Sequence, residues 1–200
     1  MSKKVVILLH GVGSQGADMA PLASQWQQQI KDVLWLTPNA PFYSDMGSGY
    51  QWFSLQGITN ANRPERIQNA RAAFDELLAN LFNQYDIAPQ HDRVVLIGFS
   101  QGAMMSLDAL VSAHWPLAGV VAFSGRLASP TPYQVKQAVP VLLVHGLSDP
   151  VVPHTESAAA ATALSELGHQ VSTQFEPELI HSISPQGVAT ASEFLAQRFR

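Results

Sequence analysis

The amino-acid sequence predicts an α/β fold in which helices flank a mostly parallel, doubly wound sheet of about six to seven strands. Three observations support this prediction: short apolar runs recur along the chain, segments with helical periodicity separate them, and 46% of the 200 residues are hydrophobic. A chain of this length buries roughly 70% of the surface that its unfolded form exposes, which is enough for a single core. We therefore expect one domain over residues 1–200.

Five apolar runs are predicted to be strands. They are rich in Val, Ile, Leu and Phe and lack polar alternation, which is typical of strands covered on both faces in a parallel sheet. Both faces of the sheet should therefore carry helices. Along the chain the runs comprise residues 5–9, 33–36, 94–99, 120–123 and 141–144, and residues 171–175 are a weaker sixth candidate.

Helices are predicted between these strands, which gives the alternation of a doubly wound sheet. Residues 62–85 place apolar side chains three and four positions apart on one face, and Asn62 with Glu65 has the spacing of an N-terminal capping pair. The other predicted helices cover residues 103–111, residues 155–167 before Gly168, and a last segment that starts near Ser184 and Pro185.

Charge and composition exclude several classes of partner. The 11 basic and 15 acidic residues give a net charge of -4, and no run of like charges could follow a phosphate backbone, so no nucleic acid is expected. The chain has no cysteine, and we predict no metal site. The apolar run 5–9 is too short for a signal peptide and no run approaches a membrane span, which favours a cytoplasmic protein without stable membrane insertion. A homodimer is compatible with the sequence.

The sharpest motif is Gly-Phe-Ser-Gln-Gly at residues 98–102, between a predicted strand and a helical segment. It matches G-x-S-x-G in the strand-turn-helix context that such a nucleophile needs. The glycines leave room for a tight turn that exposes the serine, and the following helix presents its N-terminus to developing negative charge. The pattern predicts Ser100 as a nucleophile, whereas the alternative is a glycine-rich turn with a capping serine.

A serine hydroxyl needs a base, and the base needs an orienting carboxylate. In the fold that carries this motif, the acid and then the histidine follow the serine along the chain. Asp149 comes after the predicted strand 141–144, at the carboxyl end where ligands of parallel sheets bind. It is therefore the predicted acid, although it could instead only start an Asp-Pro turn. Glu176 and Glu178 fit the order but lie too near the predicted histidine.

His181 is the predicted general base. It follows the last predicted strand and precedes the last helix, as the order of this fold requires. His145 is expected to pack at the end of its strand. The other histidines after Ser100 fall at helix ends or next to them, and these are His114, His154 and His169.

Two main-chain N–H groups are predicted to form an oxyanion hole. One belongs to Val12, in the loop after the first strand, and the other to Gln101, directly after the nucleophile. Each such donor can contribute about 3 kcal/mol of transition-state stabilisation.

The same N-terminal loop also permits a different interpretation. Residues 11–16 read G-x-G-x-x-G, the fingerprint of a Rossmann-type dinucleotide site, but that site expects an acidic residue at the end of the second strand. Residues 36–39 contain none, and Asp32 precedes the strand. Dinucleotide binding therefore stays an alternative, as does a non-catalytic α/β ligand-binding module. A serine peptidase would share the triad, but many carry domains that this chain is too short to hold.

Taken together, these motifs resemble the phospholipase/carboxylesterase family of α/β-hydrolases, which includes the acyl-protein thioesterases. The resemblance implies a compact fold without a large lid and hydrolysis of small or acyl-chain esters or thioesters through an acyl-enzyme, as in a carboxylesterase, a lysophospholipase or a thioesterase. It implies no cofactor, and it carries the triad to Ser100, Asp149 and His181 and the oxyanion donors to Val12 and Gln101. The matching segments are 9–13, 38–41, 52–53, 98–102, 123–125, 145–153 and His181.

The chain departs from the family at two positions that bear on substrate preference. Ser54 follows Trp-Phe where members commonly have aspartate, and Ser182 follows the predicted base where they have glycine. The long irregular stretch 37–62 is rich in aromatic residues, and loops of this length are often functional. We predict that it walls an apolar acyl pocket, with Trp52 as a substrate contact, although its aromatic residues could simply pack in the core.

Overall fold

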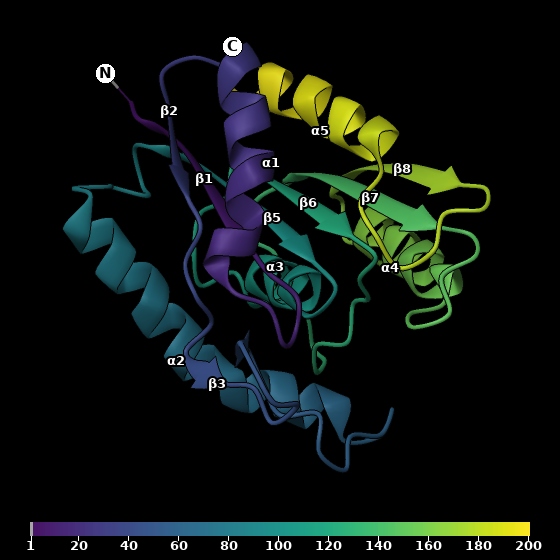
Figure 1. Cartoon of the computed structure of the whole chain (residues 1–200). Helices are drawn as coiled ribbons and strands as arrows, with labels where there is room; N and C mark the ends of the chain where they lie inside the picture. The colour runs from purple at the N-terminus through teal and green to yellow at the C-terminus, as the bar shows by residue number, and fades with distance from the viewer. Residues whose placement is uncertain (1) are drawn as a thin grey trace.

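The computed structural model describes residues 2–200 and shows a six-stranded parallel sheet between two layers of helices (Figure 1). The strand order is β2-β1-β5-β6-β7-β8, so the chain winds outward from the centre in both directions. The predicted fold class is confirmed, and the five apolar runs and the weaker sixth candidate are all strands. The strands are β1 (Lys4–Leu9), β2 (Val33–Leu36), β5 (Arg93–Phe99), β6 (Gly119–Phe123), β7 (Pro140–Gly146) and β8 (Gln170–Glu176).

Helices cover both faces of the sheet. On one face lie α1 (Gly16–Gln29) and α5 (Pro185–Arg198), and on the other lie α2 (Arg63–Gln84), α3 (Gln101–Ser112) and α4 (His154–Glu166). Successive residues of β1 illustrate the two cores, since Val5 and Ile7 pack toward α2 to α4 while Val6 and Leu8 pack toward α1 and α5. Burial on both faces explains why the strand sequences show no polar alternation.

The predicted helices begin and end close to the predicted residues, but the capping pair predicted at the start of α2 is wrong. Asn62 and Glu65 do not form a capping pair. The Asn62 side chain instead accepts a hydrogen bond from the Thr59 N–H at 2.8 Å, so it closes the preceding turn. Pro64 follows in the first turn of α2, where its missing N–H leaves one donor fewer to cap.

The stretch that the sequence analysis left irregular contains a small hairpin. Its strands are β3 (Phe42–Tyr43) and β4 (Tyr50–Gln51), which pair antiparallel. The hairpin is tied to the loop after β1, because the Gly13 N–H donates to the Tyr50 carbonyl at 2.8 Å and the Tyr50 N–H donates to the Ser14 carbonyl at the same distance.

Within residues 2–200, no helix has the length and apolar character that a membrane span requires.

Candidate active site

Ser100 occupies a strained turn between β5 and α3. Its φ of 53° and ψ of -112° lie in a region that residues with a side chain rarely adopt. The two flanking glycines permit this turn, because a Cβ on Gly98 would lie 2.3 Å from the Gly102 backbone and one on Gly102 would lie 2.1 Å from the Leu9 carbonyl oxygen. The spacing of the glycines is therefore a steric requirement of the turn that presents Ser100 at the edge of the sheet.

Three side chains from distant segments meet beside this turn. Ser100 Oγ lies 2.9 Å from His181 Nε2, and His181 Nδ1 lies 2.7 Å from Asp149 Oδ2. Because the carboxylate only accepts, His181 donates through Nδ1, which leaves Nε2 to accept the Ser100 hydroxyl proton. Asp149 follows β7 and His181 precedes α5, so the carboxyl edge of the sheet brings them together.

The Asp149 carboxylate is buried but fully hydrogen bonded. Its Oδ1 accepts from the N–H groups of Val151 at 2.8 Å and Val152 at 2.9 Å, while Oδ2 accepts from His181. Burial by itself would raise the pKa of Asp149, but the hydrogen bonds from His181, Val152 and Val151 outweigh it, and the pKa lies below its ordinary value. The group is therefore ionised when it faces the imidazole.

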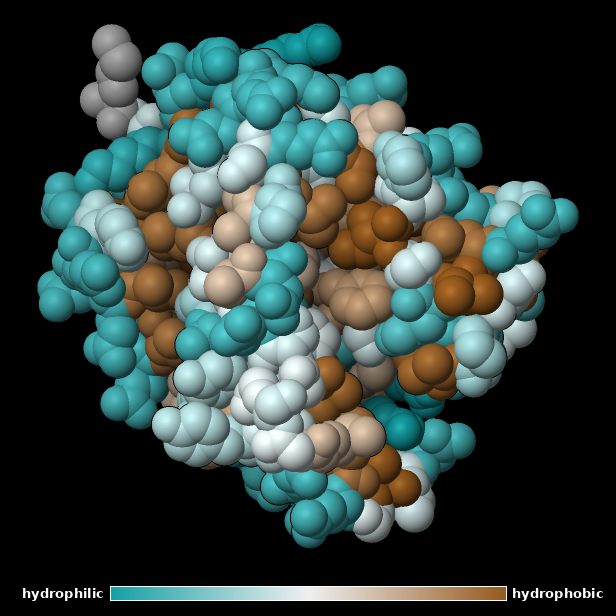
Figure 2. Space-filling view, in the orientation of Figure 1, coloured by the Kyte–Doolittle hydropathy of each residue, from teal (hydrophilic) through white to brown (hydrophobic). Residues whose placement is uncertain are grey.

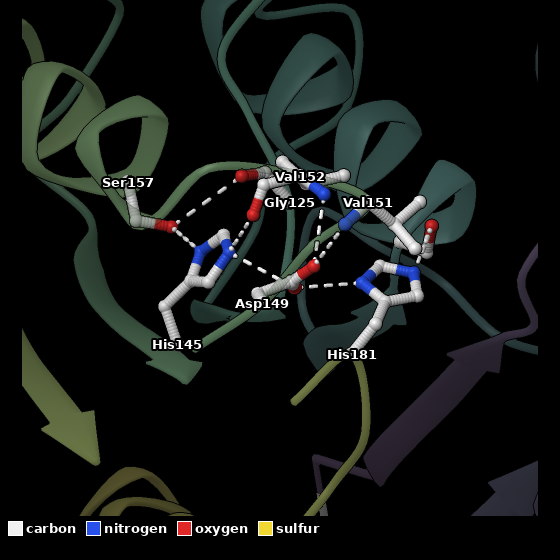
Figure 3. A network of polar contacts seen from close by, with 8 residues as sticks. Gly125, His145, Asp149, Val151, Val152, Ser157 and His181 are labelled. Atoms are coloured by element: carbon white, nitrogen blue, oxygen red, sulfur yellow. Dashed lines mark hydrogen bonds and ion pairs between the residues drawn. The ribbon is translucent and has the colours of Figure 1, made fainter. Parts of the chain in front are cut away.

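A second histidine lies behind the carboxylate, as Figure 3 shows. His145 is fully buried, as predicted, and its Nε2 lies 2.8 Å from the Val152 carbonyl and 3.2 Å from Asp149 Oδ2. Both neighbours accept, so Nε2 carries the proton and Nδ1 accepts from the Ser157 hydroxyl at 2.6 Å. Burial lowers the pKa of His145 and keeps the ring neutral. The sequence analysis missed this contact, whose only sequence signal is the i,i+4 spacing of His145 and Asp149.

The loop after β1 lies against Ser100. A Cβ on Gly11 would lie 3.5 Å from the Ser100 Cβ. From residue 13 to residue 16 every main-chain N–H has an acceptor: the Tyr50 carbonyl, the Gly11 carbonyl, the Asp18 carboxylate and the Asn39 side chain. Within residues 2–200, the Val12 N–H has no such acceptor. It is therefore available to an incoming oxyanion, and its role as a donor stays a prediction.

His10 controls the direction of that N–H. Its Nδ1 donates to the Gly11 carbonyl at 2.7 Å, and its Nε2 accepts from the Ala40 N–H at 2.9 Å. In a trans peptide the carbonyl and the next N–H point in opposite directions, so fixing the Gly11 carbonyl fixes the Val12 N–H. Burial lowers the pKa of His10, which preserves this neutral tautomer. The sequence analysis did not identify His10 as a functional residue.

Gln101 uses its side chain and its backbone differently. The side-chain amide accepts from the Trp52 N–H at 2.7 Å and donates to the Phe53 carbonyl at 2.8 Å, which clamps the hairpin onto α3. The backbone N–H stands in the first turn of α3, where helices leave their N–H groups without an internal acceptor. It is the second predicted oxyanion donor, and this role too stays a prediction.

Trp52 lies beneath the site. Its side chain is 1% exposed, and its indole N–H donates to the His10 carbonyl at 2.8 Å. Its ring meets Phe74 edge to face with centroids 5.6 Å apart. Trp52 thus supports His10 and also lines the cavity beside the hairpin, and its contact with a substrate stays a prediction.

An apolar hollow of about 380 Å³ opens beside His181, between α1 and the segment before α5. On the face of the molecule that Figure 2 shows, hydrophobic surface gathers in the middle, beside α1. The aromatic hairpin does not line this hollow. It lines a separate cavity of about 510 Å³, whose walls include Phe42, Tyr43, Trp52 and Phe53. The apolar side chains of the hollow are Val12, Met19, Leu22, Phe99 and Ile183.

Across residues 2–200, no group of three or more His, Asp or Glu side chains is arranged to hold a metal ion.

Comparisons with known proteins agree with this arrangement. The model of the phospholipase/carboxylesterase family matches residues 1–198. Esterase YpfH of Escherichia coli is 31% identical over 194 residues, which cover 97% of this chain and 82% of that protein. Acyl-protein thioesterase 1 of Neurospora crassa is 28% identical over 214 residues, covering 96% and 86% respectively.

Solved structures show the same fold. Esterase PE8 superposes with a TM-score of 0.90 at 34% sequence identity, over 98% of this chain and 93% of that chain. A carboxylesterase of Bacillus cereus superposes with a TM-score of 0.82 at 22% identity, over 98% and 89%. The second likeness bears on the fold alone.

Proposed function

This chain belongs to the phospholipase/carboxylesterase family of α/β-hydrolases, and on that premise we propose that it hydrolyses carboxylic esters and thioesters through an acyl-enzyme on Ser100. One observation carries the proposal: the Ser100 hydroxyl, on a strained turn, lies 2.9 Å from an imidazole that a buried carboxylate orients.

In the proposed first half-reaction, the Ser100 hydroxyl attacks the substrate carbonyl while His181 accepts its proton. Asp149 stabilises the imidazolium that forms, and the N–H groups of Val12 and Gln101 donate to the oxyanion. The tetrahedral intermediate then collapses as His181 returns the proton to the departing alcohol or thiol, which leaves the acyl group on Ser100.

In the second half-reaction, water replaces the alcohol. His181 accepts a proton from the water as it attacks the acyl-enzyme, and the same two N–H groups stabilise the second oxyanion. Transfer of the proton to Ser100 releases the carboxylic acid. The apolar hollow beside His181 is the proposed place for the acyl chain, so activity should depend on chain length; a flat profile across graded esters would contradict this placement.

The dinucleotide-binding alternative is not favoured. The glycine-rich loop would have to turn free N–H groups toward a pyrophosphate. Those of residues 13 to 16 are instead paired within the protein, and a Cβ on Gly16 would lie 1.9 Å from the Thr37 carbonyl oxygen. Gly16 thus serves close packing of α1 on the segment after β2.

Replacement of the nucleophile tests the proposed mechanism. Ser100→Ala should lower kcat for a short p-nitrophenyl ester by about 10⁵-fold or more, because nothing else in the site can form the acyl-enzyme. Ser112→Ala, at the far end of the same helix, is the matched control and should retain activity. Retention of most activity by Ser100→Ala would refute the assignment.

Three further properties stay proposals of this account: a location in the cytoplasm, no binding of nucleic acid, and a homodimer as an allowed state. Cell fractionation, a gel-shift assay and light scattering of the purified protein test them in turn.

A further inference from the structure

Another cavity, of about 340 Å³, lies between the start of α2, the loop after β6 and the start of α4. Unlike the hollow beside His181, it is lined by charged and polar side chains. Two arginines and one glutamate face it, together with an amide and a hydroxyl. These are Asn60, Arg63, Arg126, Ser129 and Glu156.

Arg126 has unused hydrogen-bond donors in this cavity. The residue is 9% exposed, and within residues 2–200 only its Nη1 has partners, Asn60 Oδ1 at 3.4 Å and Glu156 Oε1 at 3.3 Å. Its Nε is buried without a partner, and so is the Ser129 hydroxyl, at 5% exposure. Guanidinium carries five N–H donors, and leaving them unpaired on burial is costly. The cavity therefore offers donors that a bound acceptor would satisfy.

The charges of the cavity also favour an anion. Arg63 Nη1 donates to Asn60 Oδ1 at 2.7 Å, so both guanidinium groups reach the same amide oxygen. Glu156 is the single carboxylate of the cavity lining and faces two cations. Burial, and then the nearby charge of Arg126, lower the pKa of Arg63, while the Glu156 carboxylate opposes this shift only in part.

The cavity lies near the proposed catalytic residues, separated from them by the loop after β6 and by Ser157 and His145. Gly125, the residue before Arg126, packs on the first turn of α3, where a Cβ on Gly125 would lie 2.5 Å from the Ala103 Cβ. Its carbonyl oxygen lies 3.4 Å from the Ser157 hydroxyl, which bonds His145 behind Asp149 (Figure 3). The loop after β6 and the start of α4 both follow the carboxyl ends of strands, so the two arginines lie at the same edge of the sheet as Ser100.

We propose that Arg63 and Arg126 form an anion subsite that binds an acidic group, such as a carboxylate, carried by the ester substrate. The planar guanidinium fork suits such a group because it can donate two parallel hydrogen bonds. The subsite rests on the proposed function of Ser100 and gives the enzyme a preference for acidic over neutral esters.

Matched pairs of substrates test the preference and locate the charge. On the acyl side, the 4-nitrophenyl monoester of adipic acid is compared with 4-nitrophenyl hexanoate; on the alcohol side, 4-acetoxybenzoate is compared with 4-acetoxybenzamide. The proposal expects kcat/KM to favour the acid by about tenfold or more in one of the two pairs, and less so as salt is added. Ratios at or below one in both pairs would overturn it.

Variants tie the preference to the cavity. Arg63→Gln should lower the acid-to-neutral ratio of kcat/KM by about tenfold, because one charge-assisted donor is lost. Arg126→Gln should lower the same ratio by a similar factor. If Arg126→Gln does not fold, because Arg126 is buried, Arg63→Gln alone decides the question. Arg66→Gln, one turn further along α2, removes the same charge outside the cavity and should keep the wild-type ratio. An unchanged ratio in Arg63→Gln would contradict the subsite.

The two proposals fail in distinguishable ways. Ser100→Ala should abolish hydrolysis of acidic and neutral esters alike. If the variant still hydrolyses either ester, the acyl-enzyme mechanism is contradicted. Loss of hydrolysis in Ser100→Ala, with no preference for acidic esters in the unmodified protein, would contradict the anion subsite alone.

Discussion

Neutral, buried histidines hold the reactive groups of this site in place. The His145 ring lies behind Asp149, with Nε2 3.2 Å from Oδ2, and adds no competing positive charge; His10 fixes the peptide that presents the Val12 N–H. In both residues burial lowers the pKa, and each ring has one donor and one acceptor role. The orientation of the catalytic groups thus depends on two rings that do not touch the reacting atoms.

Replacing His10 should slow catalysis more than it weakens substrate binding. His10→Phe keeps the ring but loses its bonds to the Gly11 carbonyl and the Ala40 N–H, so the Val12 N–H is no longer fixed. We expect kcat to fall about 10- to 100-fold with KM little changed, since an oxyanion donor acts in the transition state. Steady-state kinetics measures this split, with His91→Phe as a surface control. An unchanged kcat in folded His10→Phe would contradict the positioning role.

The buried histidines should also make stability depend on pH. His10, His145 and His169 have pKa values lowered by burial from the ordinary 6.5, so the unfolded chain binds their protons first. Their contribution is complete above pH 6.5 and is lost as the pH falls toward the lowered values. Each adds a slope of up to about 1.4 kcal/mol per pH unit to the free energy of unfolding.

Urea unfolding between pH 7.5 and 5 measures that slope. His169→Gln should show a smaller slope than the unmodified protein, because the His169 ring is buried and its Nε2 has no partner within residues 2–200. A free energy of unfolding that stays constant over this range would contradict the assignment of neutral buried rings.

At the scale of elements, the turn between β5 and α3 is fixed by backbone packing against β1. Gly102 lies so close to the end of β1 that only a hydrogen fits where a side chain would start. The strain at Ser100 is held by this contact and by the Ser100 N–H, which donates to the Phe123 carbonyl at 2.9 Å. The nucleophile is therefore positioned by three neighbouring strands.

Gly102→Ala tests that packing. The new methyl group would lie 2.1 Å from the Leu9 carbonyl oxygen, so backbone must move and we expect a loss of stability of about 1–3 kcal/mol or more, with a large loss of kcat. Gly57→Ala is the comparison, because its Cβ meets nothing within 4 Å and carries only the strain of a φ of 63°. If Gly102→Ala were no less stable and no less active than Gly57→Ala, the close approach would be disproved.

Helix α1 shows what the sequence could not predict at this scale. Gly16 and Pro21 suggest a loop, and its buried residues form only a narrow stripe of Gly16, Met19, Ala23 and Trp26. The one signal of its start was a carboxylate three residues after the cap, since Asp18 accepts from the Gln15 N–H at 3.1 Å. Helix α1 supplies Met19 and Leu22 to the hollow beside His181, which the sequence did not predict. The acyl pocket predicted at the aromatic hairpin stays a prediction, and a cavity is lined by the hairpin and by Trp52.

At the scale of the whole molecule, the sequence predicted the features that depend on local pattern, namely the strands and the chain order of the triad. Five strands were identifiable because each contains an unbroken apolar run, whereas the edge strand β8 carries polar residues and gave a weaker signal. Chain order placed Asp149 and His181 at the strand ends that face Ser100. The hydrogen bond between His10 and Ala40 and the cavity of Arg63 and Arg126 depend on segments brought together only by folding. No spacing in the sequence specifies them.

The central claim is that folding makes Ser100 a nucleophile by placing His181 and Asp149 behind it. Labelling with a fluorophosphonate, followed by mass spectrometry of the peptides, tests it most directly. We predict a single adduct on Ser100 that forms in the folded protein and is nearly lost in folded His181→Ala. Labelling of another serine, or of Ser100 at an unchanged rate without His181, would contradict the account.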